Sequence, residues 1–411
     1  MNLKEISFIE FDEFAKNHPL KSFYQSSNYA LIMGEKNFDY EYIGLFNEMN
    51  VLVAASLIFT KKIKKNISYG YAPKGFLIDY KDKELVRKFT NLLKEYYSQK
   101  NVAFIKINPD IIVGKLKNNS FEHNFQTEEI KYTLSSNSYI KLKNNLYFES
   151  SLPRFNAIVD LNKLELRNLR KNTRNKIYKS QRKGLLLEKG NINSINVLER
   201  IIRKNKNYCN INLNDYYNVF NRNDSIDIFL VKIDYEEFLI NARISYDKEI
   251  EKNTYYNSKI IDNPTEDNIN AKMNSDLVLL AYKNDILEGT KGLKDEKDVY
   301  IAGAMVVKYG NTATIVASAF DKTYSRHNAN YFLHYKIMEY YKNELNYIDL
   351  NGMTGDLSTI NPYYGLNQFK LGFNPNVFEY IGEYDLIINE NDYSYLKETG
   401  ILAKEFNKKN D

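Results

Sequence analysis

The stretch "YYGLNQFKLGFNPN", residues 363–376, contains the lysine with the clearest chemical potential. Lys370 lies between Phe369 and Leu371, after the strand-like run "YIDLN" and before a second strand-like run. An ammonium group between a strand end and aromatic walls can stabilise an anion or a developing oxyanion. Lys370 is therefore a candidate stabiliser of charge. The alternative is that this loop is only a crossover between two strands.

A second chemical feature is the basic run "RNLRKNTRNKIYKSQRKG", residues 167–184, which holds eight Lys or Arg residues and no acid. As a helix it would place Leu166, Leu169 and Ile177 on one narrow stripe and spread its cations over the opposite face. Unbroken positive charge repels itself. We therefore give an anionic partner, such as the phosphates of RNA or of a lipid pyrophosphate, the same weight as a solvated surface helix.

Other residue patterns narrow the function classes. His18, His123, His327 and His334 show no zinc-binding spacing, and the single Cys209 allows neither an intramolecular disulfide nor a thiolate cluster. No Gly-x-Ser-x-Gly, Walker or Gly-x-Gly-x-x-Gly motif is present, which removes the sequence support for common hydrolases, nucleotide triphosphatases and dinucleotide enzymes. We expect no metal and no cofactor.

Composition sets the scale of the fold. The chain has 411 residues, 43% of them hydrophobic and 27% charged, which predicts two domains. A net charge of +5 is modest for this length, so a polyanion must meet a local patch. The N-terminus lacks the features of a signal peptide, and no apolar stretch is long enough to span a membrane. We expect a cytoplasmic protein with at most peripheral contact at the cytosolic membrane face.

The elements that must position these residues come in two similar sets. Strand-like runs at 42–46, 51–59 and 67–78 precede a helical pattern at 84–99 and a strand at 102–108. Strands at 298–310 and 312–320, a helix at 328–342 and a strand at 347–351 repeat this order. "LLKEYYSQKNVAFIKIN" also resembles "KIMEYYKNELNYIDLN", so we favour two copies of one α/β unit over coincidence in a Tyr- and Asn-rich chain.

Residues 235–288 have no strand signal and predict a helical hairpin broken at "IDNPTED". The two alternatives are surface helices packed on the domain and a projecting antiparallel arm. We favour the arm, because charge is dense on both helices. The apolar positions that we expect to form its seam are Leu239, Ala242, Tyr246 and Ile250 in the first helix, and Ile269, Met273, Leu280 and Leu287 in the second.

Six segments in order resemble the FemABX family of peptidoglycan bridge-forming aminoacyltransferases: "YAPKGFLIDY", "PRFNAIVDL", "LRKNTRNKIYKSQRKG", "AGAMVV", "YIDLNGMTGD" and "GLNQFKLGFNPNVFEYIGEYDL". The resemblance implies an α/β fold of two tandem GNAT-like domains with a helical arm inserted in the second. The bounds that we expect are 1–152 with the C-terminal segment 386–411 for the first domain, 153–385 for the second, and 235–288 for the arm.

The resemblance also implies a reaction. Family members transfer an amino acid from aminoacyl-tRNA to the stem-peptide amine of lipid II or of its UDP-linked precursor, UDP-MurNAc-pentapeptide. For this chain we expect an amino acid of the Gly, Ala or Ser class and a monomeric enzyme. The coenzyme A phosphate loop is missing, so a charged tRNA is the expected donor. Its expected contacts are Arg167, Arg170, Lys171, Arg174, Lys179 and Arg182.

Site residues follow from the resemblance position by position. Lys370 matches the family's Phe-Lys pair as the stabiliser of the tetrahedral oxyanion, and the carbonyl of Phe369 is expected to orient the attacking amine. The family's phosphate-binding Lys falls near Leu31 or Met33, with Lys36 close but offset, and its phosphate-binding Arg falls at Ile211 or Asn212. The general base is unassigned. The expected substrate-binding residues are Lys36, Tyr71, Lys74, Tyr363 and Tyr364.

Lys74 also has a plain local interpretation, because "YGYAPKGFLIDY" has the Pro and Gly content of a turn between strands. Two other functions remain open at this point. One is a different GNAT-type N-acyltransferase with another activated donor, and the other is a non-catalytic RNA-binding protein.

Overall fold

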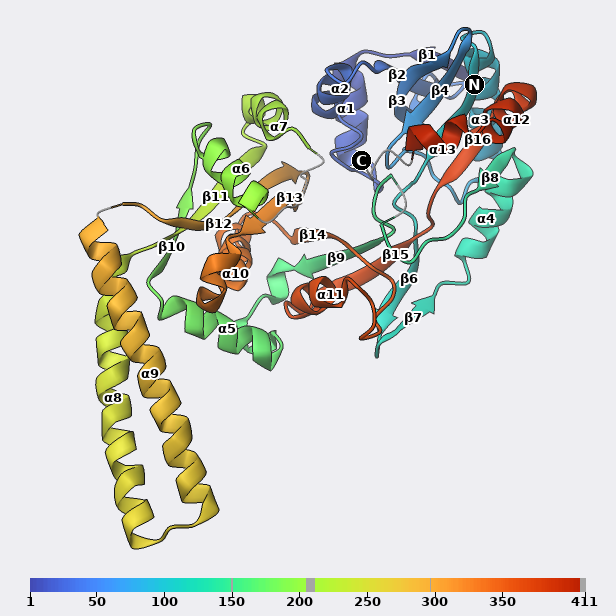
Figure 1. The fold of residues 1–411 in the computed structure, drawn as a ribbon. Helices are drawn as coiled ribbons and strands as arrows, with labels where there is room; N and C mark the ends of the chain where they lie inside the picture. The colour runs from blue at the N-terminus through green and yellow to red at the C-terminus, as the bar shows by residue number, and fades with distance from the viewer. Residues whose placement is uncertain (149–150, 205–210, 296, 407–411) are drawn as a thin grey trace.

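A computed structural model of the protein describes residues 1–148, 151–204, 211–295 and 297–406, and Cys209 lies outside them. These residues form two β-sheets, with a long helical hairpin that projects from the second (Figure 1). The strands of the first sheet, in spatial order, are β1 (Asn2–Glu5), β2 (Asp39–Phe46), β3 (Leu52–Lys64), β4 (Ile67–Ala72), β5 (Val102–Ile107), β16 (Tyr384–Ile387) and β8 (Tyr139–Lys141). Those of the second are β10 (Leu185–Lys189), β11 (Ile226–Ile233), β12 (Tyr300–Tyr309), β13 (Thr312–Phe320), β14 (Tyr347–Met353), β9 (Phe155–Asp160), β15 (Asn376–Tyr380), β6 (Ile112–Lys117) and β7 (Ser120–His123).

Helices connect and cover these strands. The helices before residue 150 and after residue 389 are α1 (Phe8–Asn17), α2 (Ser27–Gly34), α3 (Lys83–Ser98), α4 (Thr127–Ser136), α12 (Glu390–Glu398) and α13 (Ile401–Phe406). Those between are α5 (Lys171–Gln181), α6 (Ser194–Lys204), α7 (Leu213–Phe220), α8 (Tyr235–Asp262), α9 (Glu266–Asp295), α10 (Ala329–Tyr341) and α11 (Tyr364–Leu371). Short 3-10 turns are η1 (Leu161–Lys163), η2 (Leu166–Asn168), η3 (Asn221–Asn223) and η4 (Lys322–His327).

The predicted duplication is confirmed by the order of the strands. In the first sheet β2, β3 and β4 are antiparallel neighbours, and helix α3 then crosses over to β5, which lies parallel to β4. In the second sheet β11, β12 and β13 are antiparallel, and α10 crosses over to β14, parallel to β13. Each crossover helix buries an apolar face, such as Leu85, Phe89 and Leu93 of α3. The two halves are thus copies of one α/β unit.

The two sheets exchange strands, and the sequence did not indicate this for β6 and β7. Strands β6 and β7 precede residue 152 in the chain, yet they extend the second sheet through pairing of β6 with β15. The C-terminal strand β16 returns to the first sheet, between β5 and β8. The segment from 112 to 123 therefore departs from the expected bound at residue 152. The division into two domains remains a proposal.

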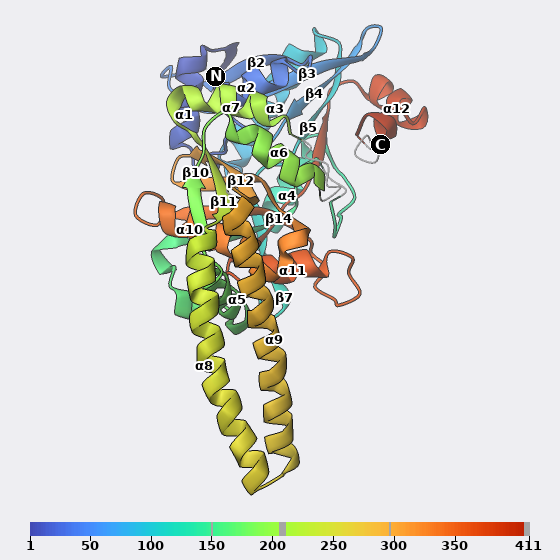
Figure 2. The same cartoon turned by 60° about the vertical axis from the view of Figure 1, so that its left-hand side comes forward.

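The hairpin of α8 and α9 projects as a single arm in two views 60° apart (Figures 1 and 2). It connects β11 to β12, which pair directly with each other, so the insertion leaves the sheet continuous. The arm confirms the predicted hairpin and extends beyond residue 288 to Asp295. Within the described part of the chain, no helix is long and apolar enough to cross a membrane.

The predicted seam of the arm is wrong for its second helix, and for Ile250 of the first, which is exposed. Met273, Leu280 and Leu287 are 60%, 56% and 62% exposed, and Ile269 is exposed as well. The seam instead contains buried polar groups, such as Glu249 Oε1, which accepts a hydrogen bond from Ser275 Oγ at 2.8 Å. Apolar spacing near 3.5 identifies a helix, but it does not show which of two stripes faces the neighbouring helix.

Candidate active site

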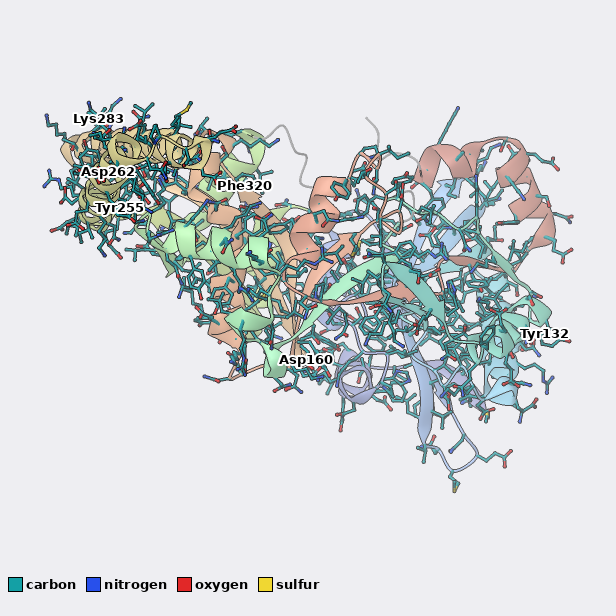
Figure 3. The ribbon with its side chains drawn as sticks, turned by 90° about the horizontal axis from the view of Figure 1, so that it is seen from below. Tyr132, Asp160, Tyr255, Asp262, Lys283 and Phe320 are labelled. Carbon is teal, nitrogen blue, oxygen red and sulfur yellow. The ribbon has the colours of Figure 1, made fainter. Side chains whose placement is uncertain are left out.

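A cavity of about 510 Å³ lies between the two halves of the molecule. Its floor is one face of the second sheet, because alternate residues of a strand point to the same side. Its wall comes from the first half, with residues 19–24, Lys74 and Asp110. Asp160, at the end of β9, lies near the middle of the molecule, well away from the arm that carries Lys283 (Figure 3). The floor residues of β9 and β14 are Asn156, Ile158, Asp160, Tyr347, Asp349 and Asn351.

Strands β13 and β14 form a fork beside this cavity. Their parallel register joins Thr312–Thr314 to Tyr347–Asp349 and ends there. Beyond the fork lies a second cavity of about 370 Å³, between the end of β13, α10 and α11. Its lining includes Tyr331, His334 and Phe369. The first cavity is thus lined in part by β14, and the second by the end of β13 and by the two helices.

Lys370 lies on helix α11, so the expected loop position is wrong. Its side chain is 8% exposed, and its Nζ donates a hydrogen bond to the carbonyl oxygen of Gly352, on β14, at 2.5 Å. Burial lowers the pKa of Lys370 to about 8, and the negative charge of Asp349 acts in the opposite direction. The segment is helical because Asn367, Lys370 and Leu371, at i, i+3 and i+4, share one buried face.

Phe369 points to the second cavity. Its ring lies 4.8 Å from the His334 ring and 5.0 Å from the Tyr331 ring, between centroids. Its carbonyl oxygen accepts the N–H of Gly372 at 3.2 Å within the last turn of α11. Phe369 therefore offers its ring to a ligand, whereas the expected carbonyl role has no support in this geometry.

Lys74 is both a turn residue and a cavity residue, so its two interpretations are compatible. It is 5% exposed, and its Nζ forms an ion pair with Asp110 Oδ1 at 2.5 Å. Its ammonium also lies 4.6 Å from the centre of the Tyr380 ring. Tyr71 lies behind this wall, where burial raises the pKa of its hydroxyl well above the ordinary range. Its hydroxyl is therefore neutral.

Three other expected substrate contacts lie away from the first cavity. Lys36 is exposed on the turn that follows α2, because that helix buries Met33 and ends at Gly34. Tyr363 is 42% exposed and packs edge-on against Phe148. Tyr364 lines a separate open hollow beside Asp356 and Gln368. The structure does not bring these residues together with Lys74.

The two positions of the missing family cations have structural roles here. Met33 is buried in a core cluster to which both halves contribute. Asn212 caps helix α7, and its Oδ1 accepts the N–H of Asn214 at 3.0 Å. Sequence reasoning missed Lys21, which lines the first cavity and has no ion pair with any residue that the structure describes. Nothing in "HPLKSFYQ" marks this lysine, because its position depends on the packing of two halves.

The basic run is only partly a helix. Helix α5 begins at Lys171, whereas Arg167 lies in η2 and is paired with Glu165. Arg170 precedes the helix and donates to Gln368 Oε1 at 3.1 Å, and Arg174 donates to the Arg167 carbonyl oxygen at 2.5 Å. The expected apolar contacts Leu169 and Ile177 are buried. The cations that remain exposed on or beside α5 without these contacts are Lys171, Lys179 and Arg182.

Helix α5 is packed directly on the helix that carries Lys370. A Cβ atom at Gly372 would lie 2.1 Å from Thr173 Oγ1, so only glycine permits this approach. Lys176 Nζ donates to the hydroxyl of Tyr331 at 2.9 Å, and Tyr331 lines the second cavity. The basic surface therefore continues to the mouth of that cavity. Among the described residues, no group of three or more His, Cys, Asp or Glu side chains is placed to bind a metal ion.

Comparison with known proteins gives consistent results. The profile of the FemAB family matches residues 6–399. The chain is 23% identical over 404 residues to the lipid II:glycine glycyltransferase of Staphylococcus epidermidis, covering 95% of this chain and 94% of that protein. It is 22% identical over 426 residues to the enzyme of the same name from Staphylococcus aureus, covering 97% and 96%. The crystal structure of FemX has the same fold, with a TM-score of 0.75 at 19% identity over 96% of this chain and 100% of that one.

Proposed function

The chain belongs to the FemAB family, and from that premise we propose that it is a tRNA-dependent aminoacyltransferase of peptidoglycan bridge synthesis. It transfers an amino acid of the Gly, Ala or Ser class from aminoacyl-tRNA to the stem-peptide amine of lipid II. The names of the glycyltransferase relatives support the acceptor and an aminoacyl product.

One observation carries this proposal: Lys370 connects the linings of two cavities. It follows Phe369, which lines the second cavity, and its Nζ donates to Gly352 of β14, the strand whose Asp349 and Asn351 line the first. A transferase needs a donor and an acceptor whose reacting atoms meet, and separate cavities that converge on one cation suit that requirement. The first cavity, of about 510 Å³, receives the acceptor peptide. The second, next to the basic helix, receives the aminoacyl end of the tRNA.

The reaction requires little covalent chemistry from the protein. An aminoacyl ester is already activated, so the enzyme aligns a neutral amine with the ester carbonyl and stabilises the tetrahedral oxyanion. Lys370 supplies the positive charge, because its ammonium is buried and directed by the Gly352 carbonyl oxygen. No covalent enzyme intermediate is needed.

The donor contacts come from α5 and not from the arm. Residues 235–295 contain twelve acidic and eight basic residues, a net charge of −4, which disfavours a polyanion. Lys171, Lys179 and Arg182 are exposed, and Tyr178 between them is 50% exposed and can stack on a base. These residues and the second cavity form one continuous donor surface.

The acceptor is lipid-linked in this proposal. Lys21 and Lys74 are the cations of the first cavity, and Lys74 is already paired with Asp110. Among the described residues, the cavity therefore offers one unpaired lysine, Lys21, to a diphosphate that both the lipid-linked and the UDP-linked acceptor carry. A peripheral approach of this basic chain to an anionic bilayer supplies the remaining attraction, at roughly 1 kcal/mol for each Lys or Arg near the surface.

One experiment distinguishes this function from the two alternatives, a different N-acyltransferase and a non-catalytic RNA-binding protein. Purified protein is offered lipid II and its UDP-linked precursor, each with a mixture of aminoacyl-tRNAs, and the products are identified by mass. Addition of one amino acid to lipid II supports the proposal. Transfer only from a donor other than tRNA would favour a different N-acyltransferase. Binding of tRNA without any product would favour an RNA-binding protein.

A further inference from the structure

We propose that Asp349 and Asn156 form the binding seat of the acceptor's primary amine, and that Asp349 is the base that takes the proton this amine loses. This inference rests on the proposed aminoacyl transfer and assigns the one role that the sequence left open. The two residues lie on neighbouring strands, β14 and β9, and both line the first cavity.

The side-chain oxygen of Asn156 is a hydrogen-bond acceptor that receives no hydrogen bond from any described residue. Its side chain is 7% exposed, and its Nδ2 donates to Asp349 Oδ2 at 2.9 Å. The carboxylate can only accept, so the amide must turn its NH2 group toward Asp349. Its Oδ1 is then left buried, with no hydrogen-bond partner in the described part of the protein. A buried carbonyl oxygen without a donor is costly, and a ligand N–H in the cavity would satisfy it.

Asp349 differs from the other carboxylates of the cavity. Asp110 is neutralised by Lys74 at 2.5 Å, and Asp160 has an ion pair with Lys163 at 3.3 Å. Asp349 is held only by neutral donors, the Asn156 amide and the N–H of Asn351 at 2.7 Å. Of these three cavity carboxylates, Asp349 is therefore the one without an ion pair to a described residue, and it is the best placed to bind a ligand cation.

A bulge in β14 fixes the directions of these groups. The register with β9 shifts between Asp349 and Gly352, and Asn351 between them has a left-handed backbone with a φ of 66°. The bulge turns the carboxylate of Asp349 to the cavity floor and the carbonyl oxygen of Gly352 to Lys370. A single distortion thus positions the base and the oxyanion stabiliser together.

The charged and titratable groups around Asp349 come from four elements. Lys370 of α11 and Lys74 after β4 act on it as cations, and the hydroxyls of Tyr24 and Tyr380 interact with its charge. Burial raises the pKa of Asp349 above the ordinary value, while its amide donors and the two lysines oppose this. A carboxyl in this position accepts a proton more readily than an exposed one.

The proton balance is complete without another reactant. The acceptor enters as an ammonium ion that donates to Asp349 and to Asn156 Oδ1. Asp349 accepts one proton, and the freed amine lone pair forms a bond to the ester carbon. The tetrahedral oxyanion lies at Lys370. Collapse breaks the bond from carbon to the ribose oxygen, the amine nitrogen loses its second proton, and the leaving oxygen gains one. The protein ends with the proton that Asp349 accepted, which it releases to water.

The first test is the pH dependence of kcat/KM between pH 6.5 and 7.5, with glycyl-tRNA and lipid II. With its base, the wild-type enzyme uses the ammonium form, so the profile is nearly flat. In Asp349→Asn only the small neutral fraction of the acceptor amine reacts, and this fraction grows about tenfold over one pH unit. Asp110→Asn is the matched control and keeps the flat profile whatever its absolute rate. A flat profile for Asp349→Asn would overturn the assignment.

The second test does not depend on turnover. The carboxyl carbon of Asp349 is followed by NMR in protein labelled with ¹³C-aspartate, and Asp349→Asn identifies its signal. We expect n-butylammonium to lower the apparent pKa of this carboxyl, n-butanol to leave it unchanged, and Asn156→Leu to weaken the response. An unchanged pKa at saturating amine would refute the binding seat. A response to the amine in a protein that transfers nothing from glycyl-, alanyl- or seryl-tRNA would retain the seat and overturn the proposed donor.

Discussion

Replacing Lys370 with Met should slow transfer strongly and at the same time stabilise the fold. Methionine has a similar length and no charge, so it can occupy the same space beside β14. In the wild-type protein the ammonium is 8% exposed and donates to the Gly352 carbonyl oxygen. Burying the Lys370 ammonium therefore lowers the stability of the fold, while its positive charge stabilises the oxyanion of the reaction.

The size of both effects follows from the structure. Burial moves the pKa of Lys370 from 10.5 to about 8. At neutral pH, where the lysine is protonated, this shift lowers the free energy of unfolding by about 3 kcal/mol. Losing the donor to Gly352 offsets about 1–2 kcal/mol of the gain. Lys370→Met should thus be about 1–2 kcal/mol more stable at pH 7, while the loss of one oxyanion donor lowers kcat about 10²- to 10³-fold.

The sign of the pH dependence provides a check. Below pH 8 the wild-type lysine is protonated in both the folded and unfolded states, so it carries the full cost. Between pH 8 and 10.5 the folded state releases its proton first, and wild-type stability rises with pH relative to the variant. The difference in Tm between Lys370→Met and wild type should therefore narrow over this range, and wild-type turnover should fall above about pH 8.

A second buried lysine supplies the control. Lys106 is 3% exposed and paired with Asp385 at 2.9 Å, so Lys106→Met leaves a buried carboxylate without its cation and should lose about 3–5 kcal/mol of stability. Thermal unfolding is followed by circular dichroism, and transfer is followed by mass. Wild-type turnover in Lys370→Met would remove this lysine from the mechanism. A constant difference in Tm from pH 8 to 10 would refute the burial argument.

Three further predictions address the donor, the acceptor and the arm. Changing Lys171, Lys179 and Arg182 to Gln should weaken tRNA binding and lower its salt slope by about 2–3, whereas the same change at arm residues Lys259 and Lys283 should leave the slope unaltered; an equal effect of both sets would remove α5 from the donor surface. Given both acceptors, the enzyme should modify lipid II in preference to the UDP-linked precursor, and the reverse preference in the product masses would overturn the lipid assignment. Replacing both Glu249 and Ser275 with Leu exchanges a buried polar pair for an apolar one and should slow tryptic cleavage of the arm; faster cleavage would show that the polar seam stabilises it.

The sequence was sufficient for the main features that depend on near neighbours in the chain. Strand-like runs and spacing of period 3.6 identified the strands and crossover helix of the first copy, and β12, β13, α10 and β14 of the second, but not β11. The break at "IDNPTED" identified the hairpin. The sequence was insufficient where a helix has two plausible faces, as in α9, whose predicted seam residue Leu280 is 56% exposed. The sequence also indicated the wrong local structure for Lys370. The Gly and Tyr residues around it suggested a loop, but the segment is a helix because one of its faces is buried.

The amino-acid sequence alone thus determined the two α/β units, the arm and Lys370 as a candidate stabiliser of charge. Only the tertiary structure decided which residues meet at the cavity. Asn156 and Asp349 are 193 residues apart in the chain, and although both lie in segments that carry the family resemblance, nothing in those segments shows that the two side chains meet. Their contact exists because β9 returns to pair with β14, a long-range pairing whose loop-closure cost is repaid by burial of the whole sheet. Lys21 and Lys74 reach the same cavity only because the two halves pack against each other, and no local pattern records that packing.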